Sequence, residues 1–148
     1  MKSAEEWFAE YEASHQNPSN KQIHYVCVPA ILWSVLAALW SLPTPSAVNE
    51  HFSWAYVFAF LALLFYLRLG IRYFFVMLGV SFVAFAIDNY FDRLGLPLLS
   101  TSVGVFVLAW IGQFYGHILE GKRPSFFKDL QFLLIGPLWI AMRAGLAP

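Results

Sequence analysis

The stretch LPLLSTSVGVFVLAWIGQFYGHILEG, residues Leu96–Gly121, places three polar side chains near the end of an almost wholly apolar segment. Gln113, His117 and Glu120 recur at intervals of four and three residues, a spacing that puts them on one face of an α-helix. Polar and ionisable groups are costly in or near hydrocarbon, so they usually face the protein interior and mark a functional site. The segment therefore predicts a membrane helix with a functional polar face.

The composition of the whole chain indicates a membrane protein. Of its 148 residues, 59% are hydrophobic and only 12% are charged, which is about half the charged fraction of a typical soluble domain. The net charge is zero, and no basic patch indicates a nucleic-acid partner. The one cysteine, Cys27, cannot form an internal disulfide, and the acidic start of the chain does not resemble a secretory signal peptide. We expect one integral membrane domain over residues 1–148.

Five apolar stretches predict the membrane-spanning helices. A span takes about 20 apolar residues, with a range of roughly 17–25, so the first and fourth stretches are long enough and the second and third are marginal. The fifth stretch is short and holds Gly136-Pro137, which also fits a half-helix or a re-entrant segment. We therefore expect an all-α membrane bundle of four to five short spans over residues 20–148. The five stretches are Tyr25–Leu42, Phe52–Leu67, Tyr73–Ile87, Leu96–Tyr115 and Leu130–Met142.

Residues 1–19 are expected to form an amphipathic helix at the membrane interface. Ser3 and Glu6 fit a capping box at its start. The helix should end before the first proline of the chain, because a residue that precedes proline disfavours helical geometry. Asn20 is expected to be the N-cap of the next helix, which places His24 in the first turn of that helix.

The charges in the loops predict how the chain is oriented. If all five stretches cross the membrane, seven of the nine basic residues lie on one side and two on the other. The positive-inside rule then places the N-terminus in the cytoplasm. The same topology brings His15, His24 and His117 to the cytoplasmic face, whereas His51 lies on the far side. Asp88, Asn89 and Asp92 are expected to cap or solvate the end of the third stretch.

Three histidines at one membrane face can hold a single metal ion. Imidazole and carboxylate ligands suit iron, zinc and similar ions, so either the three histidines or two of them with Glu120 satisfy an open site. His15 and His24 taken alone each also fit an ordinary interfacial role, and Glu120 can instead pair with Lys122 or Arg123 at a helix end. Gly112 and Gly116 form a small-xxx-small pattern, which predicts another helix packed closely against the polar face.

The residues alone leave several functions open. A single ion at this site can be iron or zinc, and the sequence does not choose between them. One alternative is a zinc-dependent membrane hydrolase that acts on lipid. Another is a non-catalytic membrane protein that presents a binding surface, for which we expect no metal.

Two blocks of residues together form a recognisable motif. The first block holds His15, Asn20, Ile23-His24 and Pro29, and the second runs Gln113-Phe-Tyr-Gly-His117 and Glu120-Gly-Lys-Arg-Pro124. In these blocks, and in its hydrophobic spacing, the chain resembles the iron(II)-dependent 2-hydroxy fatty acid dioxygenases of fatty acid α-oxidation. The resemblance implies a small multi-span protein that oxidises a 2-hydroxy fatty acid with O2 and shortens it by one carbon.

The resemblance also implies roles for individual residues. The implied iron(II) ligands are His15, His24 and His117. The other polar residues of the motif, which are candidate catalytic residues, are Asn20, Gln113 and Glu120. Glu120 is expected either to orient a histidine ligand or to shuttle a proton. Lys122 and Arg123 are candidates for attracting the carboxylate of the substrate. The implied partners are the fatty acid, O2 and the lipid bilayer.

Overall fold

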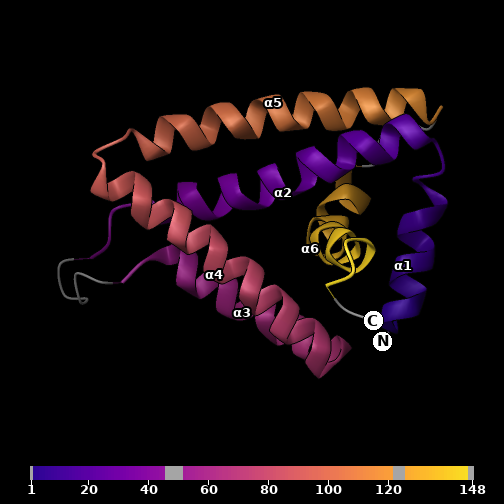
Figure 1. Cartoon of the computed structure of the whole chain (residues 1–148), viewed down its shortest axis with the longest axis horizontal. Coiled ribbons are helices and arrows are strands. Elements are labelled where there is room, and N and C mark those ends of the chain that lie inside the picture. The colour runs from indigo at the N-terminus through magenta and orange to yellow at the C-terminus, as the bar shows by residue number, and fades with distance from the viewer. Residues whose placement is uncertain (1, 46–51, 122–125, 147–148) are drawn as a thin grey trace. The chain divides into compact units, whose positions relative to one another are not determined.

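The described part of the structure is all-helical, which confirms the all-α class and leaves the number of membrane spans a prediction. This computed structural model describes residues 2–45, 52–121 and 126–146, with side chains only from residue 132 onwards in the last range. Within these ranges there are helices and no strand (Figure 1). The helices in chain order are α1 (Ala4–Ala13), α2 (Pro18–Trp40), α3 (Trp54–Leu69), α4 (Ile71–Arg93), α5 (Leu98–Leu119) and α6 (Phe126–Arg143).

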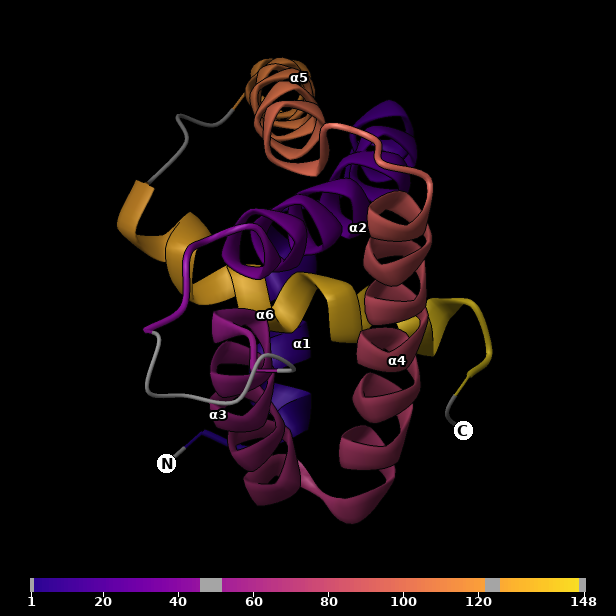
Figure 2. The same ribbon diagram turned by 90° about the vertical axis from the view of Figure 1, so that its left-hand side faces the viewer.

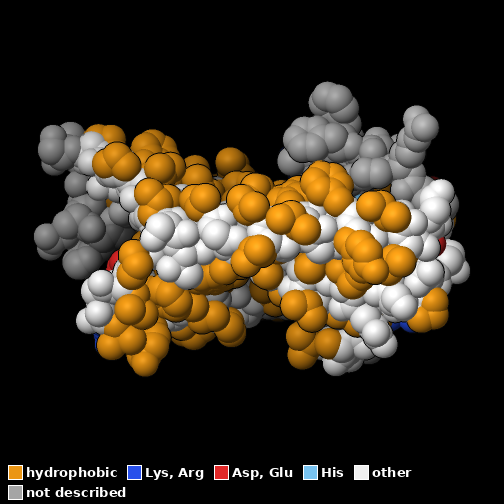
Figure 3. All heavy atoms as spheres, turned by 90° about the horizontal axis from the view of Figure 1, so that it is seen from above, with side chains coloured by type: hydrophobic (Ala, Val, Ile, Leu, Met, Phe, Trp, Pro, Cys, Tyr) orange, Lys and Arg blue, Asp and Glu red, His pale blue; other side chains and the backbone are white. Residues whose placement is uncertain are grey.

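Three helices, α2, α4 and α5, are long and apolar enough to cross a membrane. Helix α3 and the apolar part of α6, residues 132–143, are shorter. Figure 3 looks onto α5 and shows apolar side chains spread along the whole length of that face, with few charged ones. Leu108 and Ile118 on α5 are 70% and 71% exposed, as expected of side chains that contact lipid tails.

The chain divides into two compact units, residues 1–32 with 107–148 and residues 33–106, and α2 and α5 contribute to both. In the second unit, α3 and α4 form a hairpin (Figure 2). Gly70 alone joins them, with a φ of 151° that favours glycine, so the two helices are connected by a tight turn. The expectation for Asp88 is wrong, because α4 continues past it to Arg93 and Asp88 is fully buried.

In the first unit, α1 packs against α6 through aromatic side chains. The ring of Tyr11 meets Phe132 edge-on at 5.2 Å between centroids and lies 5.3 Å from Trp139. Gly136 allows this approach, because a Cβ atom there would lie 3.1 Å from the hydroxyl oxygen of Tyr11. Each aromatic pair adds about 0.5–1.5 kcal/mol beyond the area it buries, so this contact holds α1 on α6.

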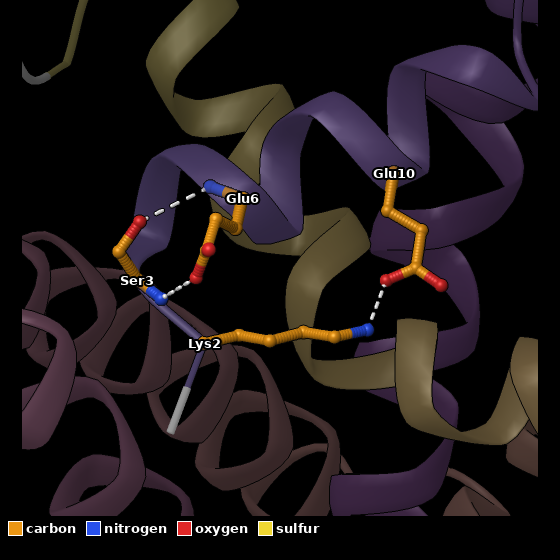
Figure 4. A network of polar contacts seen from close by, with 4 residues as sticks. All are labelled: Lys2, Ser3, Glu6 and Glu10. Carbon is orange, nitrogen blue, oxygen red and sulfur yellow. Dashed lines mark hydrogen bonds and ion pairs between the residues drawn. The ribbon is translucent and has the colours of Figure 1, made fainter.

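The two ends of the N-terminal region show one confirmed prediction and one correction. Ser3 and Glu6 form the predicted capping box at the start of α1, beside an ion pair between Lys2 and Glu10 (Figure 4). Asn20 is not the N-cap of α2, since α2 already begins at Pro18. The side-chain oxygen of Asn17 accepts hydrogen bonds from the backbone N–H groups of Ser19 and Asn20 instead. Pro18 then occupies the first helical position, where its missing N–H group is not needed.

The glycine pattern in α5 packs closely against α2, as predicted. A Cβ atom at Gly112 would lie 2.6 Å from the sulfur of Cys27, and one at Gly116 would lie 2.3 Å from the side-chain oxygen of Asn20. Both distances are shorter than van der Waals contact, so a Cβ atom at either position would force the facing side chain of α2 to move.

Candidate metal centre

Three histidines from three segments of the first unit lie together. His15 precedes α2, His24 lies in the second turn of α2, and His117 lies in the last turn of α5. Their side chains are 2%, 1% and 7% exposed. One ring nitrogen from each lies within 4.8 Å of the other two. Nitrogen ligands about 2.1 Å from a shared ion lie roughly 3–4 Å apart, so a small closure brings the three rings onto one ion.

The backbone fixes the tautomer of two of the rings. Nδ1 of His15 lies 2.6 Å from the carbonyl oxygen of Tyr11, and Nδ1 of His24 lies 2.9 Å from that of Asn20. A carbonyl oxygen only accepts hydrogen bonds, so both Nδ1 atoms carry the proton and each Nε2 atom carries a lone pair. This arrangement is typical of metal-binding histidines, whose second nitrogen donates to a carbonyl or carboxylate.

The ring of Tyr11 holds His15 in place. The two rings stack with centroids 4.0 Å apart and an angle of 16° between their planes. Tyr11 therefore supports His15 twice, through its ring and through its backbone carbonyl oxygen. We did not assign this role from the sequence, although Tyr11 precedes His15 by four residues, the interval that places two side chains on one helix face.

A small cavity adjoins the histidines. Its volume is about 30 Å³, and its lining combines the three rings and Gln113 with apolar side chains that include Ile31, Trp110 and Phe132. Gln113 is 7% exposed, and in the described part of the chain its Nε2 atom has no hydrogen-bond partner. A buried amide donor without a partner costs stability, so a donor beside the metal-binding atoms indicates a place for an oxygen-bearing ligand.

The carboxylate of Glu120 lies at the turn between α1 and α2 and outside the histidine group. It accepts hydrogen bonds from the backbone N–H groups of Gln16 and Asn17, at 2.7 and 2.9 Å, and from the side-chain amide of Asn20, at 2.9 Å. Burial favours a higher pKa for Glu120, but the three hydrogen bonds outweigh it and hold the pKa below its usual value. Glu120 therefore stays ionised at neutral pH.

The other predicted site residues are placed as follows. Asn20 is fully buried. Its side-chain amide donates to Glu120, its side-chain oxygen packs against Gly116, and its backbone carbonyl oxygen accepts the hydrogen bond from His24. The candidate substrate-binding residues Lys122 and Arg123 lie outside the described residues, as does His51. Their predicted roles stay predictions.

The donor set suits a divalent transition metal. Three neutral imidazoles bind iron, zinc, copper and nickel, and they leave coordination positions for further ligands. Gln113 lines the same cavity, and its unpartnered Nε2 atom is a donor that can serve an oxygen ligand there. The residues therefore fit a metal ion, and the histidines alone do not choose between iron and zinc.

The fold and the site together define a class: an all-helical chain with membrane-length helices and a buried three-histidine group. The family model described as "2-hydroxy-palmitic acid dioxygenase Mpo1-like" matches residues 1–145, so the chain belongs to the Mpo1-like family. The chain is also similar to the 2-hydroxy-palmitic acid dioxygenase MPO1 of Saccharomyces cerevisiae, with 28% identity over 134 residues that cover 88% of this chain and 72% of the relative. No solved structure matches the chain.

Proposed function

We propose that this protein oxidises 2-hydroxy fatty acids with O2, shortening the chain by one carbon, and that it uses one iron(II) ion held by His15, His24 and His117. Membership of the Mpo1-like family and the name of the yeast relative support the substrate and the reaction class. The buried three-histidine group is the single observation that supports the metal site.

The reaction class favours iron over zinc. Oxidising a 2-hydroxy acid to the acid one carbon shorter, with carbon dioxide and water as the other products, removes four electrons, and one molecule of O2 accepts all four. When bound, iron(II) supplies the redox chemistry that activates O2, which zinc cannot supply because it has no accessible redox states. No separate reductant enters this balance.

The residues around the ion bind and orient the substrate. Gln113 donates a hydrogen bond from Nε2 to a carboxylate or hydroxyl oxygen of the substrate, which satisfies a donor that has no partner in the described structure. Trp110, Phe132 and Ile31 exclude water from the same space. The Nδ1–H bonds of His15 and His24 keep their Nε2 atoms directed to the ion.

The acyl chain lies outside the cavity. A volume of about 30 Å³ holds one or two water molecules, whereas pockets that enclose a ligand measure roughly 300–1,000 Å³. Only the polar end of the substrate therefore reaches the histidines. The hydrocarbon tail runs along apolar helix surfaces and stays in the lipid.

We further propose that residues 1–148 act as one integral membrane domain with α1 at the interface. Helices α2, α3, α4 and α5 cross the bilayer, with α3 as a shorter span, and α6 adds a short or re-entrant segment. The excess of basic residues on one side supports a cytoplasmic N-terminus, with the metal centre on the same face. Labelling of single cysteines introduced at residues 2 and 95, before and after membrane permeabilisation, tests this orientation.

The direct test uses protein purified without oxygen and loaded with iron(II) or zinc. We expect iron-loaded protein to convert 2-hydroxypalmitate and O2 to a 15-carbon acid. Single alanine substitutions of His15, His24 and His117 should each lower the bound iron. Unchanged iron content in all three variants defeats the ligand assignment, and absence of the 15-carbon product from fully loaded protein defeats the proposed activity. Turnover of lipid esters with zinc and without O2 favours the hydrolase instead.

A further inference from the structure

We propose that Glu120 is a positioning residue that fastens the turn between α1 and α2 to the end of α5 and so sets the spacing of the three histidines. This inference rests on the proposed metal site. It assigns Glu120 neither to the ion nor to proton transfer, and it gives the orienting role expected from the sequence a specific form, in which Glu120 acts on the backbone of the turn and not on a histidine ring.

Both oxygen atoms of the Glu120 carboxylate accept hydrogen bonds from the turn between α1 and α2. One oxygen, Oε1, accepts from the N–H group of Gln16, and the other, Oε2, accepts from the N–H group of Asn17 and the side chain of Asn20. The side chain of Asn17 adds a fourth bond, donating to the carbonyl oxygen of Leu119 at 3.1 Å. Four hydrogen bonds thus join residues 16–20 to residues 119–120, which are about a hundred positions later in the chain.

The start of α2 is a favourable place for a carboxylate. Residues 16 and 17 immediately precede α2, whose first N–H groups have no partner within the helix. The helix dipole also makes the N-terminus of α2 favourable for a negative charge. A neutral side chain of the same size offers one acceptor atom fewer and no charge, so it cannot replace the carboxylate.

All three histidines lie close in the sequence to residues that these hydrogen bonds hold. His15 directly precedes Gln16, and His24 donates from its ring to the backbone of Asn20. His117 lies one helical turn before Glu120. Each histidine is therefore within about one turn of an anchored residue, so movement at Glu120 is passed to all three rings.

The alternative role as a proton shuttle fits the site less well. Glu120 is absent from the residues that line the cavity beside the histidines. Both of its oxygen atoms already accept hydrogen bonds from the turn. A group that moves protons at neutral pH works best with a pKa near 7, and the pKa of Glu120 is shifted in the opposite direction.

The test compares Glu120→Gln with the wild type and with Ser3→Ala as a control. Ser3 caps α1 far from these bonds along the chain, so its loss destabilises the helix that precedes His15 and leaves the Glu120 contacts intact (Figure 4). Affinity for cobalt(II) and iron(II) is measured by competition with a chelator. Backbone hydrogen exchange at Gln16 and Asn17 is measured in the metal-free protein.

We expect Glu120→Gln to weaken metal binding by roughly 10–100-fold and to speed exchange at both amides. At saturating iron its kcat should recover substantially, with the pH profile of the wild type. Asn20→Ala, which removes one of the three donors, should give the same changes at smaller size and serves if the first variant does not fold. Ser3→Ala should lower the melting temperature with metal affinity unchanged.

Four outcomes overturn the inference. If Glu120→Gln binds metal with wild-type affinity, the positioning role is wrong. The role is also wrong if Ser3→Ala loses as much metal affinity as Glu120→Gln, because the loss then reflects general destabilisation. A kcat that stays low at saturating metal, with an altered pH profile, assigns Glu120 to proton transfer. If the wild type itself binds no metal, the proposed metal site fails and this inference fails with it, a result seen in the unsubstituted protein alone.

Discussion

Three glycines along α5 give a sharp test of how closely this helix packs beside the histidines. Gly104, Gly112 and Gly116 are each changed to alanine, which adds one methyl group. In a helix this change stabilises by up to about 1 kcal/mol when nothing obstructs the new Cβ atom. At Gly104 no atom lies within 4 Å of that position, so we expect the full gain there.

The other two positions differ in what the new methyl group meets. At Gly112 it meets the sulfur of Cys27 at 2.6 Å, and this partly exposed thiol can turn to another rotamer at a cost of about 1 kcal/mol, so the net change is near zero. At Gly116 it meets Asn20 at 2.3 Å and His24 at 3.3 Å, and Asn20 is fully buried and bonded to Glu120. Overpacking costs about 1–3 kcal/mol and the lost hydrogen bond about 1–2 kcal/mol, so the net loss is about 1–4 kcal/mol.

The assay is unfolding in detergent combined with metal titration. The expected order of stability is Gly104→Ala, then Gly112→Ala, then Gly116→Ala, and only Gly116→Ala should also lose metal affinity, because only its methyl group reaches a histidine. If Gly116→Ala is as stable as Gly104→Ala and binds metal as tightly, α2 and α5 do not pack at the observed separation. The close packing of α2 on α5 would then not hold His24 and His117 at the observed spacing.

Three further predictions concern the charge, the donor and the cavity. The pKa of Glu120 is lowered in the folded state, so the ionised carboxylate stabilises the fold at pH values above its unfolded-state pKa, near 4.5. The difference in stability between wild type and Glu120→Gln should therefore be full at pH 7 and vanish as the pH falls through the folded-state pKa. Unfolding midpoints measured between pH 7 and 3 test this prediction. Gln113→Ala should raise KM for 2-hydroxypalmitate roughly 10-fold with iron content unchanged, and Gln113→Glu should raise it further because a carboxylate repels that of the substrate. Acids of 12 to 20 carbons, compared at equal mole fraction in a bilayer, should be oxidised within about threefold of one another, whereas a steep optimum would show that an enclosed pocket measures the chain.

Much of the helical architecture could be predicted because it depends on local pattern. The capping box at Ser3, the turn at Gly70 and the close packing at Gly116 each follow from a few neighbouring residues and their spacing. The start of α2 was also within reach, since proline favours the first helical position and points to Asn17 as the cap. The length of α4 could not be predicted, because a charged residue such as Asp88 is typical of the end of an apolar helix. Only the packing of the second unit shows that Asp88 is buried.

In the candidate site, the features that depend on neighbouring residues could be predicted, and those that depend on residues far apart in the chain could not. The ring orientations of His15 and His24 each depend on a carbonyl group four residues earlier, so both contacts are local in the sequence. The bonds of Glu120 join residues about a hundred positions apart, and no periodicity in the sequence shows which N–H groups a carboxylate will meet. A charged residue beside a ligand motif is therefore ambiguous from sequence, because a ligand, a proton carrier and an anchor all require the same residue type. In the structure the hydrogen-bond partners separate these roles: both oxygen atoms of Glu120 point to the turn that carries His15, and that turn needs an acceptor whether or not a metal is bound.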